Sequence, residues 1–117
     1  MAALLIVACA ATAAEAAGAL PRLKILPGSL TVSGVSAGGY MATQYQVAYS
    51  KDVIGAGIIA AGPWFCAQGL LTRALDECMK GSPIGPEIRP LVAALRSSAA
   101  ARGVDDPSWI APDRIWM

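Results

Sequence analysis

The sequence predicts an α/β protein built on a parallel strand–helix–strand unit, and three consecutive segments support this. Residues 30–34, LTVSG, alternate apolar and polar side chains as a half-buried strand does. Residues 38–50 have helical character, and residues 53–62, VIGAGIIAAG, form an apolar run that suits a strand buried on both faces. This order of elements implies a parallel sheet with a right-handed crossover.

Local features of the sequence support each of these elements. Residues 20–29 are an extended lead-in that ends in a Pro-Gly turn. The helix expected over 38–50 places four side chains at helical spacing on one face: Met41, Tyr45, Ala48 and Tyr49. The glycines and alanines of the second strand would let helices approach it closely.

The remaining chain predicts further α/β elements. Residues 63–86 are loop-like, with a short helix around residues 70–75. A second helix is expected from Pro90 to Gly103, since proline is tolerated in a first turn and glycine ends helices. Residues 104–113 form a turn-rich link, and residues 114–117, RIWM, begin a third strand.

Length and composition narrow the classes of function. A chain of 117 residues suits at most one domain. With 56% hydrophobic and 15% charged residues, it is too apolar to be a disordered chain. Its net charge of +1 provides no electrostatic case for nucleic acid or an anionic surface as a partner.

The N-terminal residues 1–19 predict a signal peptide. They are apolar from Ala2 to about Ala14 and rich in small residues beyond, which matches the hydrophobic and cleavage regions of a secretory signal. The apolar run is too short to span a bilayer, so no stable membrane insertion is expected. No Lys or Arg precedes it, which is atypical, and a buried N-terminal helix of a cytoplasmic protein is the alternative. We therefore expect a secreted or periplasmic protein with residues 20–117 as its folded part.

Cysteine usage is consistent with export. Removal of the signal would remove Cys9 and leave Cys66 and Cys78, an even number. In an oxidising compartment these two residues suit a disulfide; in the cytoplasm they would be two unpaired buried thiols. Two cysteines and no histidine cannot fill a tetrahedral zinc shell, so no metal is expected, and no cofactor either.

The sequence GVSAG at residues 34–38 predicts a nucleophile elbow. Such an elbow needs small residues two before and two after its serine, because the strand-to-helix turn is sharp. Gly34 and Gly38 meet this need, Ser36 would be the nucleophile, and the Ala37 backbone N–H would stabilise an oxyanion. The alternative is a glycine-rich packing or phosphate turn, although neither G-x-G-x-x-G nor a P-loop lysine is present.

Four strings together carry a resemblance to a known family: VSGVSAGGYMA, QVAYS, GAGIIAAGPWFCA and ECM. They resemble the start of secreted poly(3-hydroxybutyrate) depolymerases, firmly over residues 20–80. The resemblance implies a circularly permuted α/β-hydrolase fold whose nucleophile lies near the mature N-terminus. It also implies Ser36 as that nucleophile, the Ala37 N–H as an oxyanion donor, and Cys66 and Cys78 as disulfide partners.

The absence of any histidine is the main objection to a catalytic serine in this chain. A serine hydroxyl is a poor nucleophile without a base, and a Ser-His-Asp triad uses histidine for this purpose. Lysine does not replace histidine as the base, because a Ser-x-x-Lys motif would be needed. None of the three lysines stands in such a motif: Lys24, Lys51 and Lys80.

The aspartates do not complete a triad either. They are interpreted as caps, turns and solvated charges: Asp52, Asp76, Asp105, Asp106 and Asp113. Asp113 precedes the last predicted strand, whereas the catalytic acid of the family follows the matching strand. The resemblance therefore implies a partial α/β-hydrolase fold, truncated before the catalytic acid and histidine. A fragmentary sequence is the favoured explanation and a natural inactive remnant the other; either would be inactive alone.

These observations predict a fragment of a secreted serine esterase that hydrolyses poly(3-hydroxybutyrate)-type polyesters through an acyl-Ser36 intermediate. Its partner would be a polyester or short-chain ester. The alternatives are a non-catalytic remnant or interaction module, and another exported carboxylesterase. Three aromatic side chains either line an apolar path to the polymer or belong to an ordinary core: Tyr40, Trp64 and Phe65.

Overall fold

The computed structural model describes residues 18, 19, 21–80 and 87–117, so most of the predicted signal segment lies outside the described residues. The strands are β1 (Leu30–Val35), β2 (Val53–Ile59) and β3 (Arg114–Trp116). The α-helices are α1 (Ala37–Ala48), α2 (Leu71–Arg73) and α3 (Ile88–Ala100). A π-helical turn, η1 (Ala74–Cys78), continues α2, and a 3₁₀ turn, η2 (Pro107–Ile110), precedes β3.

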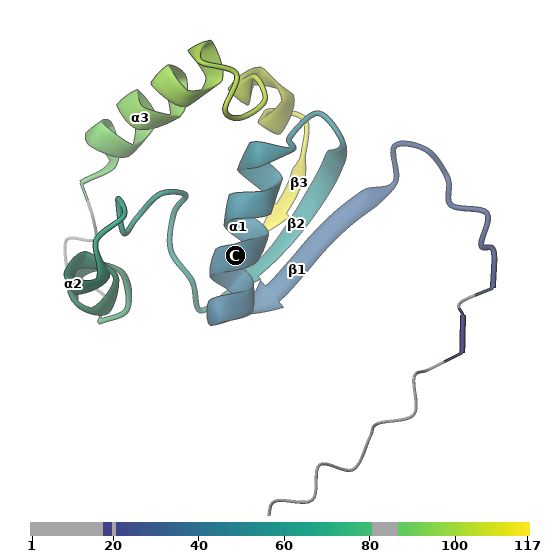
Figure 1. Ribbon diagram of the computed structural model, residues 1–117, viewed down its shortest axis with the longest axis horizontal. Helices are drawn as coiled ribbons and strands as arrows, with labels where there is room; N and C mark the ends of the chain where they lie inside the picture. The colour runs from purple at the N-terminus through teal and green to yellow at the C-terminus, as the bar shows by residue number, and fades with distance from the viewer. Residues whose placement is uncertain (1–17, 20, 81–86) are drawn as a thin grey trace, which may run out of the picture.

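The three strands form one parallel sheet in the order β1-β2-β3. Thr31 lies opposite Gly55, and Val35 lies opposite Ile59, so β1 and β2 run in register to the same edge of the sheet. Helix α1 connects these two strands and packs against both (Figure 1). The predicted parallel strand–helix–strand unit and the predicted third strand are confirmed.

Helix α1 packs on the sheet with a different face from the one that its large side chains suggest. The buried side chains of the helix are small or polar: Ala42, Thr43, Gln46 and Val47, with Gly39 at the closest approach. Met41 is 67% exposed and Tyr49 51% exposed. Close packing explains this choice, since a Cβ added to Gly39 would lie 2.8 Å from the backbone oxygen of Ile59.

The opposite face of the sheet is not covered by any element that the structure describes. Val35 is 60% exposed and Ile54 is 47% exposed, and Ile59 is exposed as well. The prediction that residues 53–62 form a strand buried on both faces is therefore wrong for the described part of the chain. The apolar run alone cannot distinguish one covered face from two.

The link before β3 is tied to the turn between α1 and β2. The backbone N–H of Lys51 donates to Asp105 Oδ2 at 3.0 Å, and buried Ser50 donates from Oγ to the backbone oxygen of Asp106 at 3.3 Å. The carboxylate of Asp106 also accepts from the backbone N–H of Ser108 at 2.8 Å, which caps η2. Asp105 and Asp106 thus serve as turn and cap residues, as predicted.

The hydrogen bonds of the Asp106 carboxylate at this cap should weaken in acid. The backbone and side-chain hydrogen bonds from Ser108 hold the pKa of its carboxyl below the ordinary value. A carboxylate with a lowered folded-state pKa stabilises the fold above its unfolded pKa, and this contribution is lost as pH falls through the folded value. Thermal unfolding followed from pH 7 to pH 3 should show a smaller acid-induced fall in Tm for Asp106→Asn than for the parent chain. An equal fall in Tm in the two proteins would contradict a stabilising role of the Asp106 carboxylate.

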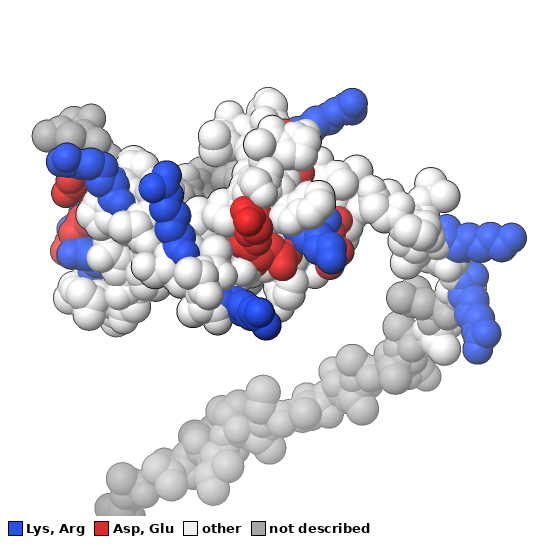
Figure 2. All heavy atoms as spheres, turned by 90° about the horizontal axis from the view of Figure 1, so that it is seen from above, with Lys and Arg blue, Asp and Glu red and all other residues white. Residues whose placement is uncertain are grey.

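Charged side chains of both signs are interspersed on the face of the molecule that Figure 2 presents. Ion pairs between neighbouring residues of the described chain include Arg73 with Glu77 at 3.1 Å and Arg89 with Glu87 at 3.0 Å. Exposed pairs of this kind contribute little to stability, about 0–1 kcal/mol each. The described charges therefore form no extended patch of one sign on this face.

Candidate active site

Ser36 is the single residue between the end of β1 and the start of α1. Its backbone has φ 52° and ψ −119°, a conformation that residues other than glycine rarely adopt. Two hydrogen bonds hold it there: the Ser36 N–H donates to the Ile59 backbone oxygen, and the Tyr40 N–H donates to the Ser36 oxygen, each at 2.9 Å. The strained turn is therefore fixed by the sheet on one side and the helix on the other.

Two glycines make room for this turn. A Cβ at Gly34 would lie 2.2 Å from the backbone carbon and oxygen of Gly38, and a Cβ at Gly39 would lie 2.8 Å from Ala61 Cβ. A Cβ at Gly38 would meet no described atom within 4 Å. The prediction that Gly34 and Gly38 both avoid a side-chain collision is correct for Gly34 and wrong for Gly38. It is the backbone of Gly38 that leaves no room at position 34.

The turn presents Ser36 at the N-terminus of a helix. Ser36 and Ala37 are both exposed. The bond from the Tyr40 N–H to Ser36 is the first of the helix, and the N–H groups of the preceding turn have no acceptor within a helix. The N–H of Ala37 is the first of these groups, and the helix dipole adds positive potential beside it. A hydroxyl next to such an N–H can attack a carbonyl whose oxygen then accepts a hydrogen bond from Ala37.

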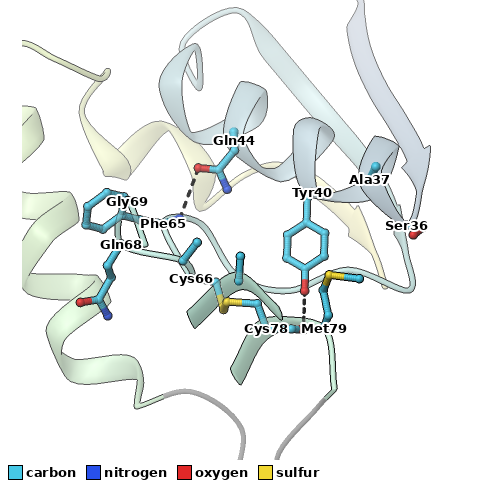
Figure 3. A pocket seen from close by; sticks show the side chains of 12 residues that line it. Ser36, Ala37, Tyr40, Gln44, Phe65, Cys66, Gln68, Gly69, Cys78 and Met79 are labelled. Carbon is cyan, nitrogen blue, oxygen red and sulfur yellow. Dashed lines mark hydrogen bonds between the residues drawn. A yellow bond between two sulfur atoms is a disulfide. The ribbon is translucent and has the colours of Figure 1, made fainter. Parts of the chain in front are cut away.

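A cavity of about 450 Å³ opens beside this serine (Figure 3). No charged side chain is among the described residues that line it. These are Ser36, Ala37, Tyr40, Gln44, Phe65, Cys66, Ala67, Gln68, Gly69, Ala74, Cys78 and Met79. The turn at Ser36, helix α1 and the segment after β2 therefore line one mainly apolar cavity.

A disulfide and two hydrogen bonds fasten the far wall of this cavity. Cys66 and Cys78 are joined, with an S–S distance of 2.11 Å, as the resemblance implies. The Tyr40 hydroxyl donates to the backbone oxygen of Cys78 at 2.5 Å, and Gln44 Oε1 accepts from the Phe65 N–H at 3.3 Å. Figure 3 shows both side chains reaching from α1 to this wall. The wall is thus held against the same helix that follows the serine.

Removing the disulfide should destabilise the protein appreciably. The bond closes a loop between residues 12 apart, which the chain-entropy model values at about 3 kcal/mol. The double variant Cys66→Ser and Cys78→Ser should lose about this much free energy of unfolding in urea titrations. A reductant should have the same effect on the parent chain and none on the double variant. A loss below about 0.5 kcal/mol would show that the bond does not constrain the fold.

Sequence reasoning identified part of the cavity. Tyr40 and Phe65 line it, whereas Trp64 is absent from the lining and instead lies with its ring 5.1 Å from that of Phe65. Gln44 and Met79 were missed. The spacing of four residues from Tyr40 to Gln44 places both on one helix face and would have indicated Gln44. Met79 belongs to the ECM string, but no pattern indicated that its side chain, which directly follows the η1 turn, lines a cavity.

Asp113 lies far from this site in the topology. It immediately precedes β3, and parallel strands start at the edge opposite to that where Ser36 follows β1. Its Oδ2 accepts a hydrogen bond from the buried Gln46 Nε2 at 3.1 Å. Asp113 thus ties the start of β3 to α1, at the sheet edge opposite Ser36.

Over residues 18, 19, 21–80 and 87–117, no three His, Cys, Asp or Glu side chains gather as metal ligands. None of the helices described there has both the length and the apolar character needed to cross a membrane. The full sequence contains no histidine, so any histidine base for Ser36 would have to come from outside these 117 residues.

Comparison with known proteins gives two matches to polyester-degrading enzymes. The chain is 44% identical over 100 residues, 85% of its length, to a poly(3-hydroxybutyrate) depolymerase of Delftia acidovorans. It is 54% identical over 55 residues, 45% of its length, to a polyhydroxybutyrate depolymerase of Talaromyces funiculosus. The matched parts are 20% and 16% of those two proteins. No family model matches the chain, and no solved structure matches it.

Proposed function

Because this chain is related to the poly(3-hydroxybutyrate) depolymerases over most of its length, we propose that it carries the nucleophile of a polyester-hydrolysing serine esterase. The observation that supports this most strongly is the strained backbone of Ser36 between β1 and α1. A strained conformation of this kind persists only where the surrounding structure holds it, and such positions cluster at functional sites.

In the proposed reaction, Ser36 Oγ attacks the carbonyl carbon of an ester while a base takes the hydroxyl proton. The negative charge that develops on the carbonyl oxygen is stabilised by the Ala37 N–H and the N-terminus of α1. The intermediate expels the alcohol, which takes up a proton, and leaves an acyl-Ser36 ester. A water molecule then attacks this ester, releases the acid and restores the serine hydroxyl.

The chain contains no histidine that could act as the base in this reaction. We therefore propose that the 117 residues alone have little or no esterase activity, and that they act as a piece of a larger catalytic unit. The lengths of the matches support this, since they cover 20% and 16% of the two related depolymerases.

An extracellular or periplasmic location belongs to the same proposal. Cys66 and Cys78 form a disulfide, and disulfides persist mainly in oxidising compartments. The first 19 residues have the composition of a secretory signal. Such an enzyme would meet a polyhydroxybutyrate polymer, the substrate for which both relatives are named, outside the cytoplasm.

A chemical-rescue experiment tests the role of Ser36. The 117-residue chain is incubated with a fluorophosphonate probe, with and without imidazole as a replacement base, and its adducts are located by mass spectrometry. We expect an adduct on Ser36 that forms faster with imidazole and is absent from Ser36→Ala. Labelling spread over other serines, or no labelling at Ser36 with imidazole, would instead favour the non-catalytic interaction module.

A further inference from the structure

We propose that the cavity beside Ser36 binds the aliphatic chain of an uncharged ester and thereby sets the chain length that the site prefers. This inference rests on the proposed function, since it places the ester carbonyl at Ser36 and Ala37. It adds the part of the substrate that lies away from the reacting atoms.

The lining of the cavity indicates the chemical class of this ligand. Its described side chains carry no charge, and Phe65, Ala74 and Met79 contribute apolar surface to the lining. The polar groups among them include Gln44 and Tyr40, but both already make hydrogen bonds to the loop wall. An aliphatic chain can therefore fill the interior without leaving a charged group unpaired.

The position of the cavity indicates how the ligand is oriented. Ser36 and Ala37 contribute to its lining, and Figure 3 shows Tyr40 extending from the same helix to Cys78 and Met79 at the other side. An ester whose carbonyl lies against Ser36 and Ala37 can thus extend its chain along Tyr40. Cavities of about 300–1,000 Å³ are typical of small-molecule sites, and this one measures about 450 Å³.

Hydrogen bonds and the disulfide fix the wall of the cavity and keep the cavity open. The Met79 N–H donates to the Ala74 oxygen at 3.0 Å, a bond across five residues that widens the turn into a π-helix. Such turns are rare and are often found at functional sites. The disulfide and the Tyr40 hydroxyl hold the end of this turn, so the wall does not depend on contacts of its exposed side chains.

Binding of a homologous ester series tests the proposal without requiring catalysis. The 117-residue chain, labelled with ¹⁵N, is titrated with ethyl butyrate, ethyl hexanoate and ethyl octanoate, and dissociation constants are taken from amide shifts. Affinity should rise about fourfold for each added methylene until the cavity is full. The shifts should centre on Ala37, Phe65 and Gly69. No saturable binding of any ester, or shifts centred on the exposed sheet face, would overturn the proposal.

Two variants and one matched control locate the binding. Ala74→Phe fills the cavity and should weaken ethyl hexanoate binding at least tenfold, while Ala93→Phe makes the same change at an exposed position of α3 and should leave it within twofold. Met79→Ser provides a second variant that is safe for folding, because Met79 is 67% exposed, and it should also weaken binding. Equal affinities in Ala74→Phe and Ala93→Phe would overturn the proposal.

Ser36→Ala separates this inference from the proposed function. The series of affinities should persist in Ser36→Ala, because the cavity and not the hydroxyl binds the chain. A missing fluorophosphonate adduct with intact ester binding would contradict the esterase role alone. An adduct at Ser36 with no dependence of affinity on chain length would contradict the cavity proposal alone.

Discussion

Replacing Ser36 by alanine should lower hydrolysis of poly(3-hydroxybutyrate) by about 10⁴-fold or more in a hybrid enzyme. In this hybrid, residues of the present chain replace the 100 matched residues of the Delftia acidovorans depolymerase. The expected loss is large because removal of a serine nucleophile disables the whole catalytic unit, and only binding and oxyanion stabilisation remain. The measurement is the initial rate of release of soluble acid from polymer granules.

Ser33→Ala in the same hybrid is the matched control. Ser33 lies three residues earlier, on the exposed face of β1 and away from the cavity lining, and its loss should change the rate by less than twofold. Activity that survives in Ser36→Ala, or that is lost equally in Ser33→Ala, would contradict the assignment of the nucleophile. Comparing the granules with soluble short esters also distinguishes a polyester depolymerase from another exported carboxylesterase.

The second large effect is expected on stability, from Gly34→Ala. The added methyl group would lie 2.2 Å from backbone atoms of Gly38, which cannot move aside as a flexible side chain can. Either β1 or the first turn of α1 must shift, so the free energy of unfolding should fall by about 3 kcal/mol or more. Urea unfolding followed by circular dichroism measures this loss.

Gly38→Ala is the control for this prediction, since it adds the same methyl group four residues later, where no described atom lies within 4 Å. A helix gains from alanine in place of glycine, so this variant should be unchanged or more stable by about 0.5–1 kcal/mol. Equal losses in the two variants would show that the turn is not constrained as described.

The sequence predicts the sheet and the elbow well because both follow from local rules. The alternation in β1, the apolar run of β2 and the small residues around Ser36 each restrict the backbone directly. The three strands that result have the predicted order along the chain and the predicted parallel direction. The turn at Ser36 is likewise recognisable from Gly34, because sterics exclude a larger side chain at that position.

Sequence patterns do not predict which side chains of this chain pack into the core. The large side chains of α1 suggest that Met41 and Tyr49 face the core, yet both are exposed, because the glycine-rich sheet favours a close contact with the small residues of the helix. The cavity wall was only partly predicted for a related reason. The π-helical turn that precedes Met79 is bonded to α1 through the Tyr40 hydroxyl, and no periodicity of the sequence encodes it.

The two hydrogen bonds of Ser36 set the size of the unit that must be moved when this serine is engineered into another protein. One bond joins Ser36 to Ile59 at the end of β2, and the other joins it to Tyr40 in the first turn of α1. Grafting the pentapeptide at 34–38 alone would sever both anchors and let the residue relax to an ordinary turn. The minimal transferable module is therefore residues 30–61, a contiguous cassette that carries its own scaffold for the reactive hydroxyl.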